Sequence, residues 1–181
     1  MALSTSAIAR QAAYKWGAAS LFASLGTILL ALGFEHIGGH EPCQLCLQQR
    51  YAYYLAIPAL FLALVFIGME KYNTAITLFS ITALAFLANA GLGTYHAGIE
   101  WEFWDGPATC AAGTLQPLST NGMGVLQSLG TPDGASCGLA TWRFLGLSFA
   151  GWNVVISIAL TMGSLKAAFA SAGLRPIQSR P

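Results

Sequence analysis

Four long apolar stretches constrain this chain more than any other feature. They run over residues 16–34, 47–67, 74–94 and 145–165, and Arg50 is the only charged residue within them. About 20 apolar residues in a helix cross a hydrocarbon core of ~30 Å. Because backbone in lipid must satisfy its hydrogen bonds within its own segment, each stretch is predicted to be a helix. The sequence therefore predicts an all-α, polytopic membrane four-helix bundle, with residues 1–181 forming a single integral membrane domain.

The charge content excludes other classes of protein. Only 8% of the residues are charged, whereas a soluble domain carries roughly 25%. The net charge is +1, so the chain lacks the basic surface that binding to nucleic acid requires. We therefore expect membrane lipid, and no nucleic acid, among its partners.

The distribution of cations predicts the orientation in the membrane. Placing both termini in the cytoplasm puts six of the eight Lys and Arg residues on the inner side, in agreement with the positive-inside rule. The segment between the third and fourth stretches, residues 95–144, then becomes a long periplasmic loop. The first apolar stretch is longer than the roughly 7–15 residues of a signal-peptide core, so we expect an uncleaved anchor. The six inner cations are Arg10, Lys15, Lys71, Lys166, Arg175 and Arg180.

All four cysteines fall on the predicted outer side. Cys43 and Cys46 precede the second stretch, and Cys110 and Cys137 lie in the long loop. That compartment is oxidising in bacteria, so disulfides are expected there, although four cysteines allow several connectivities. A Cys-x-x-Cys disulfide closes a very small ring and is typically redox-labile. The pattern indicates thiol–disulfide exchange between two pairs on one face of the membrane.

Cys46 is predicted to be the cysteine that ionises to a thiolate most readily. Cys46 lies at the predicted start of the second helix, where backbone N–H groups and the helix dipole stabilise negative charge. Arg50 follows one turn later on the same face and would lower the cysteine pKa further.

Simpler interpretations of the same residues remain open. Arg50 could extend to the lipid headgroups. The Cys-x-x-Cys pair could bind zinc with a histidine, although a second Cys-x-x-Cys is missing. Cys110 and Cys137 could form a purely structural bridge worth roughly 3–4 kcal/mol. The histidines available for the zinc interpretation are His36, His40 and His96.

Four segments together resemble one known family. They are the motif Cys43-Gln-Leu-Cys46 with Arg50, the segment 95–101 (YHAGIEW), the segment 103–107 (FWDGP) ahead of Cys110, and the segment 142–148 (WRFLGLS) after Cys137. In this combination they resemble the DsbB family of disulfide bond formation proteins, from about Trp16 to Leu165.

The resemblance implies an inner-membrane enzyme and assigns roles to its residues. Such an enzyme reoxidises a periplasmic thioredoxin-fold dithiol oxidase (DsbA-like) and passes two electrons to a quinone, either ubiquinone or menaquinone. Cys110 would form the mixed disulfide with the partner, and Cys137 would exchange with Cys43. Cys46 would face the quinone, with Arg50 stabilising its charge. His96 and Trp142 align with positions that line the quinone site of the family; no metal is implied, and the chain is expected to be a monomer.

Two other functions are compatible with four helices and two cysteine pairs. An enzyme of the vitamin K epoxide reductase type also couples these elements to a quinone, but its loop pair precedes its Cys-x-x-Cys, the reverse of the order here. A non-enzymatic membrane scaffold with two structural disulfides is the other alternative, and it predicts reduction potentials below about −300 mV.

Overall fold

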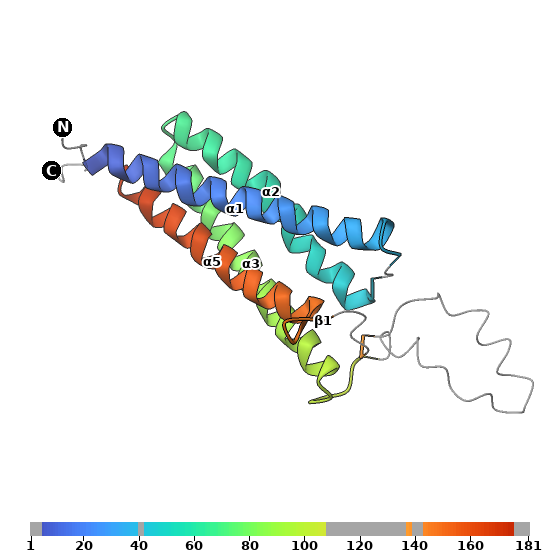
Figure 1. Ribbon diagram of the computed structural model, residues 1–181. Helices are drawn as coiled ribbons and strands as arrows, with labels where there is room; N and C mark the ends of the chain where they lie inside the picture. Colours follow the sequence, from blue (N-terminus) through green and yellow to red (C-terminus); the bar gives the residue numbers. More distant parts are fainter. Residues whose placement is uncertain (1–4, 40–41, 108–136, 139–142, 176–181) are drawn as a thin grey trace, which may run out of the picture.

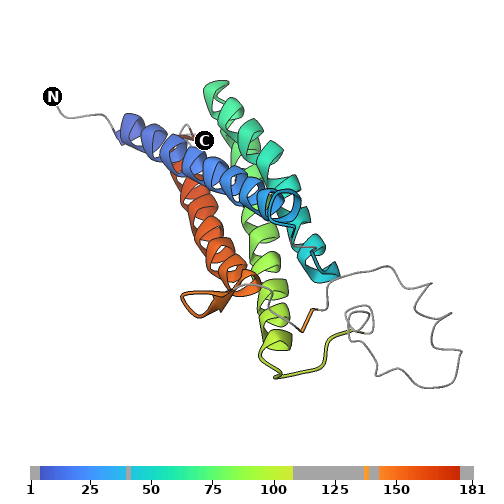
Figure 2. The ribbon, with the colours of Figure 1, turned by 45° about the vertical axis from the view of Figure 1, so that its right-hand side comes forward.

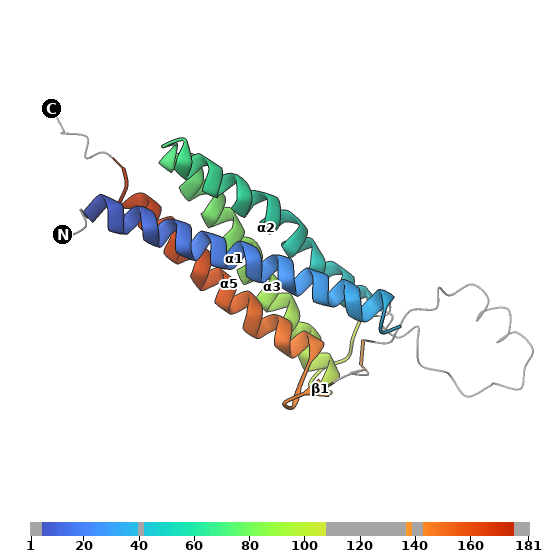
Figure 3. The same ribbon diagram turned by 45° about the horizontal axis from the view of Figure 1, so that its top comes forward.

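Four long helices form the body of the protein. The computed structural model describes residues 5–39, 42–107, 137–138 and 143–175. Helices α1 (Thr5–His36), α2 (Gln44–Gly68), α3 (Tyr72–Glu100) and α5 (Phe149–Ala172) lie side by side as a bundle (Figures 1–3). All four are long and apolar enough to cross a membrane. The predicted all-α membrane bundle with a long connection between its third and fourth spans is confirmed.

The bundle exposes many large apolar side chains and buries several small polar ones. Phe22 and Phe169 are 70% and 73% exposed, while Ser24 and Ser157 are fully buried. Water would make such an exposed surface unfavourable, whereas lipid tails are as apolar as the side chains themselves. Small residues in the interior let the helix backbones approach closely. The surface is that of a multi-pass membrane protein.

One end of the bundle is closed by a short turn between α2 and α3. Glu70 in this turn has a φ of 58°. Arg10 near the start of α1 donates to the carboxylate of Glu70 at 3.3 Å and to the Tyr72 hydroxyl at 3.0 Å. The start of α1, the turn and the end of α5 therefore lie at the same end (Figure 1). The cysteine motif lies at the opposite end of α2.

The fourth helix begins later than predicted. Residues Arg143–Phe144 (β1) pair with Leu147–Ser148 (β2) as a two-stranded antiparallel hairpin. Leu145 and Gly146 form its turn with φ values of 52° and 82°, which is typical of a two-residue hairpin turn. The Ser148 hydroxyl then accepts from the Gly151 N–H and caps α5. The prediction that a helix starts at residue 145 is therefore wrong.

The third helix ends later than predicted. It continues through Glu100, so residues 95–100, which were assigned to the loop, are helical. His96 and Glu100 consequently share one face of α3, one turn apart. Because α3 continues to Glu100, His96 lies in a helix and not in a loop, and its side chain has a defined position.

Close packing of α1 yields a prediction about stability. A Cβ at Gly17 would lie 2.8 Å from Leu64 and 3.0 Å from Phe79, whereas one at exposed Gly26 meets no described atom within 4 Å. We expect Gly17→Leu to lower the free energy of unfolding by about 1–3 kcal/mol because it overpacks the core. Gly26→Leu, in the same helix, is the matched control and should leave that free energy nearly unchanged. Unfolding in mixed detergent micelles measures both; equal effects would contradict the helix packing.

Candidate redox site

The cysteine motif forms the first turn of α2. Cys43 is the N-cap of the helix, and its Sγ accepts a hydrogen bond from the backbone N–H of Cys46 at 3.3 Å. The Cys43 and Cys46 sulfurs lie 3.0 Å apart, and both are free thiols. Because the helix starts at Gln44 rather than at residue 47, the sulfur that receives the helix N–H belongs to Cys43. The helix-start position that was expected to belong to Cys46 therefore belongs to Cys43, while the role of Cys46 toward a quinone stays a prediction.

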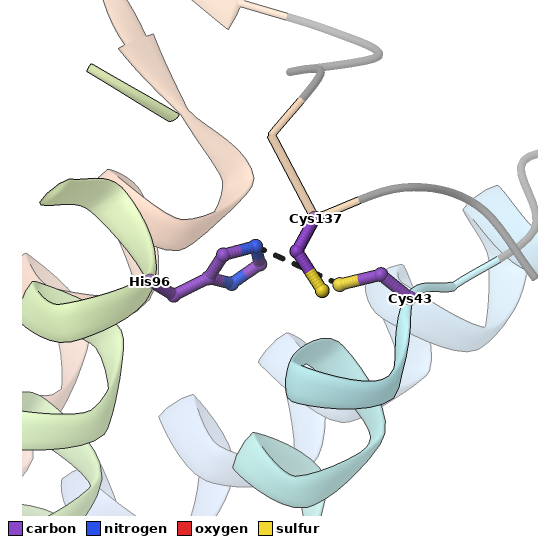
Figure 4. A group of neighbouring side chains, drawn as sticks. All are labelled: Cys43, His96 and Cys137. Atoms are coloured by element: carbon purple, nitrogen blue, oxygen red, sulfur yellow. Dashed lines mark hydrogen bonds between the residues drawn. The ribbon is translucent and has the colours of Figure 1, made fainter. Parts of the chain in front are cut away.

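Two further residues meet Cys43 from distant parts of the chain. His96 on α3 is 2% exposed, and its Nε2 lies 3.6 Å from the Cys43 Sγ (Figure 4). The side-chain donor atoms of Cys43, His96 and Cys137 all lie within 4.8 Å of one another. Cys137 is 1% exposed and is disulfide-bonded. A free thiol, an imidazole and a disulfide sulfur thus share one buried site.

The same three residues bear on the zinc interpretation. A cysteine binds zinc as a thiolate. The Cys137 sulfur is already bonded to another sulfur, so in this redox state it offers no thiolate. The cluster is better suited to exchanging disulfides than to holding a metal ion.

The surroundings of Cys43 stabilise its anionic form. These contacts lower the pKa of Cys43 to about 4. The largest contribution is the hydrogen bond from the Cys46 thiol, followed by the hydrogen bond and charge of His96 and by the Cys46 N–H, while burial acts in the opposite direction. An unperturbed cysteine has a pKa of roughly 8.5. At neutral pH, Cys43 is therefore a thiolate in the reduced pair.

This pKa predicts how alkylation of Cys43 depends on pH. The thiolate is the reactive form, so its reaction with iodoacetamide should stay nearly constant down to about pH 5 and be halved near pH 4. A short alkylation pulse on the dithiothreitol-reduced chain, with the site located by tandem mass spectrometry, measures this. His96→Ala should move the midpoint upward, while His36→Ala, a histidine exposed at the end of α1, should not. A wild-type midpoint near pH 8.5 would contradict the assignment.

A cavity of about 380 Å³ opens on the other side of Cys46. Its walls come from α1, α2 and α5 with β1 and are mainly apolar. Leu30, one of the lining residues, is 66% exposed on the outside of α1, so the cavity reaches the surface that faces lipid. Ligand pockets typically have volumes of roughly 300–1,000 Å³ and a few well-placed polar groups. Its polar and aromatic lining includes Phe34, Glu35, Cys46, Gln49, Arg50, Tyr53, Trp152 and Asn153.

An ion pair lies at the wall of this cavity. The Arg50 guanidinium donates to the Glu35 carboxylate from the last turns of α1. The two side chains are only 13% and 23% exposed. Arg50 is therefore held inside the protein by Glu35 rather than extended toward the headgroups.

The predicted site residues divide into two groups. Cys43, His96 and Cys137 meet at the exchange cluster, while Cys46 and Arg50 line the cavity. His96 contacts Cys43 and Gln49 and is not among the residues that line this cavity, and its assignment to a quinone site stays a prediction. Cys110 and Trp142 lie outside the described residues.

Several residues that line the cavity are not predicted from the sequence. Polar side chains inside an apolar stretch are the signal that could have found them, because such groups are costly in lipid and often functional. Gln49 and Tyr53 are one such pair, one helical turn apart. Trp152 carried no comparable signal, since tryptophan is common near membrane boundaries. The missed residues are Glu35, Gln49, Tyr53, Trp152 and Asn153.

Comparisons with known proteins agree on one family. A family model described as "Disulfide bond formation protein DsbB" matches residues 14–167. The Disulfide bond formation protein B of Xanthomonas oryzae pv. oryzae (strain MAFF 311018) is 30% identical over 152 residues, covering 81% of this chain and 85% of that protein. Its namesake from Xanthomonas campestris pv. campestris (strain 8004) is 29% identical over 188 aligned residues, covering 91% and 98%.

A more distant relative extends the agreement. The Disulfide bond formation protein B of Albidiferax ferrireducens is 27% identical over 137 residues, covering 74% of this chain and 75% of that protein. No solved structure matches the chain. Since the family model covers most of the sequence and a relative reaches 30% identity over most of both chains, the chain belongs to the DsbB family and has a role in disulfide bond formation.

Proposed function

We propose that this protein is a thiol oxidase that reoxidises a DsbA-like dithiol oxidase in the periplasm and transfers the two electrons to a membrane quinone. The observation that carries the proposal is the position of Cys43 and Cys46 between a buried disulfide and a lipid-facing cavity. The soluble protein substrate and the lipid-soluble oxidant require two separate places of reaction. Family membership favours this function over a vitamin K epoxide reductase type of enzyme and over a non-enzymatic scaffold.

The sulfur chemistry follows from which sulfurs can approach each other. A thiolate of the partner attacks Cys110, forms a mixed disulfide and releases Cys137 as a thiolate. Cys137 then attacks Cys43 of an oxidised Cys43–Cys46 pair, so that one S–S bond forms, another breaks, and the electron pair leaves on Cys46. The short distance between the Cys43 and Cys137 sulfurs supports this step. The partner's second thiolate then attacks its own sulfur in the mixed disulfide, closes the partner's disulfide and releases Cys110. The Cys110 thiolate attacks Cys137, which re-forms their bond, breaks the Cys137–Cys43 bond and leaves Cys43 and Cys46 reduced.

The cavity fits a quinone headgroup. A bound quinone supplies a two-electron, two-proton acceptor, which is the chemistry that reclosing the Cys43–Cys46 disulfide requires. The cavity offers flat apolar and aromatic walls for a ring, with Arg50 as a permanent hydrogen-bond donor near Cys46. Its access from lipid suits a ligand with an isoprenoid tail. Arg50, Trp152 and Phe149 are the residues that we expect to hold the ring.

We propose the inner membrane as the location, with both termini in the cytoplasm and all four cysteines facing the periplasm. The cations Arg10 and Lys166 lie at the end of the bundle opposite the cysteine motif, and the positive-inside rule places that end in the cytoplasm. The whole chain acts as one membrane domain and as a monomer in this proposal.

Anaerobic mixing with a quinone tests the function. The fully reduced chain carries four thiols and should therefore convert two quinones to quinols per chain. Loss of the ultraviolet absorbance of the quinone measures the product, and mass spectrometry counts the remaining thiols. Short-tailed ubiquinone and menaquinone analogues, tested separately, identify the preferred acceptor. Thiols that persist in the presence of either quinone would contradict the proposal.

A further inference from the structure

A chain of buried polar side chains runs from His96 into the middle of the bundle. The Gln49 Nε2 lies 3.0 Å from the His96 Nδ1, and the Gln49 Oε1 accepts from the Asn153 Nδ2 at 2.7 Å. The Asn153 Oδ1 in turn accepts from the Tyr53 hydroxyl at 2.7 Å and from the Asn89 Nδ2 at 3.3 Å. The chain joins α2, α3 and α5, and none of these side chains takes part in the sulfur chemistry described above.

The hydrogen bonds of this chain all run in one direction in the structure. The Asn89 Nδ2 donates to both Ser157 and Asn153. The Asn153 Oδ1 accepts from Asn89 and from Tyr53, and its Nδ2 donates to Gln49. With its Oε1 engaged, Gln49 has only its amide N–H to offer to His96.

This fixed direction determines where the proton of a neutral His96 lies. A ring nitrogen that accepts a hydrogen bond carries no proton, so Nδ1 is bare and the proton resides on Nε2. Nε2 points to the Cys43 sulfur at 3.6 Å. The opposite tautomer would direct a nitrogen lone pair at a thiolate and would leave the Gln49 N–H facing another N–H.

The charged groups around His96 favour the same arrangement. On the Nε2 side lie the Cys43 sulfur and, at 3.9 Å, the Glu100 carboxylate, which is itself held by the Ser148 hydroxyl. Cys137 approaches the same side with a sulfur in a disulfide, which does not titrate. Negative charge thus faces Nε2, and an amide donor faces Nδ1.

We propose that Gln49, oriented by Asn153, is a positioning residue that holds His96 as its Nε2–H tautomer, so that the imidazole donates a hydrogen bond to the Cys43 thiolate. The inference rests on the proposed function for its consequence. The reduced pair recloses when the Cys43 thiolate and the Cys46 thiol form an S–S bond; two electrons and the Cys46 proton would pass to the quinone, which would take its second proton from water. A Cys43 sulfur kept unprotonated by His96 is ready for that bond.

Nitrogen NMR of the histidine ring tests the proposal without reference to quinone. In the full chain labelled with ¹⁵N-histidine, His96 should show the Nε2–H tautomer, with its signals assigned by their loss in His96→Asn. Gln49→Leu should abolish this preference and raise the midpoint for alkylation of Cys43 by about 1 pH unit, since a hydrogen bond to the thiolate is weakened. Gln48→Leu, at the adjacent exposed glutamine, should change neither.

Gln49→Glu keeps the shape of the side chain and reverses its hydrogen bonding. A carboxylate accepts from His96, so this variant should place a proton on Nδ1, either as the Nδ1–H tautomer or as an imidazolium protonated on both nitrogens, even where Gln49→Leu fails to fold. An Nδ1–H tautomer in the wild-type chain, or an Nδ1 that stays unprotonated in Gln49→Glu, would overturn the proposal. If the tautomers behave as expected but no quinol forms, the proposed function fails while the role of Gln49 stands.

Discussion

Replacing Cys46 with serine is expected to lower quinone reduction by at least about a thousandfold, because a two-electron transfer from a dithiol requires both sulfurs. Cys43→Ser should have an equally large effect, since Cys46 then lacks the neighbouring sulfur, 3.0 Å away in the reduced pair, with which it forms a disulfide. Serine is nearly the same size, so the bundle should remain folded. Quinol formation by the reduced variants under anaerobic conditions measures both losses.

The loop cysteines provide the matched controls for this experiment. Cys110→Ser and Cys137→Ser should still reduce quinone when Cys43 and Cys46 are reduced chemically, with one quinol per chain. The same two variants should fail to oxidise a reduced DsbA-like protein. These two results would assign Cys43 and Cys46 to the quinone, and Cys110 and Cys137 to the protein partner. Full turnover by Cys46→Ser, or loss of quinone reduction in Cys137→Ser, would contradict the assignment of one cysteine pair to the quinone and the other to the protein partner.

The membrane spans could be predicted because one free-energy term, the transfer of apolar side chains out of water, dominates their placement. Uninterrupted apolar stretches have few stable environments other than lipid, so four helices could be read from hydropathy alone. Their ends depend on weaker local terms. The α5 boundary is set by the hairpin turn at Leu145 and Gly146, and the α2 boundary by Cys43 serving as a cap. A shift of three residues at that cap was enough to give the helix-start hydrogen bond to the sulfur of Cys43 instead of that of Cys46.

The site was predictable only in part because it is assembled across helices. The cysteine motif and Arg50 are local in sequence and could be recognised. Glu35 pairs with Arg50 across two helices, and Gln49 bonds to Asn153 over a separation of 104 residues. A single sequence contains the polar residues but not the crossing of the helices that joins them. His96 was chosen by resemblance, and only the helical continuation of α3 shows that it contacts Cys43.

The ion pair at the cavity gives the second large prediction. Arg50→Met should lower the efficiency of quinone reduction by about 10- to 100-fold, the usual cost of losing a hydrogen bond from a charged group. The change should appear mainly in the KM for quinone if Arg50 holds the ring before reaction. Steady-state kinetics with a short-tailed quinone measure it. Arg50→Lys should recover only part of the loss, because an ammonium lacks the planar pair of donors.

Arg50→Met could also act through Glu35, whose half-buried carboxylate would be left without its partner. The double variant Glu35→Gln/Arg50→Met separates the two causes, since it removes the orphaned charge together with the guanidinium. If Arg50 binds the quinone directly, the double variant should be as impaired as Arg50→Met, and Glu35→Gln alone should change KM by less than about threefold. Restored activity in the double variant would instead show that Arg50 serves only to neutralise Glu35, and the assignment of Arg50 to the quinone would be wrong.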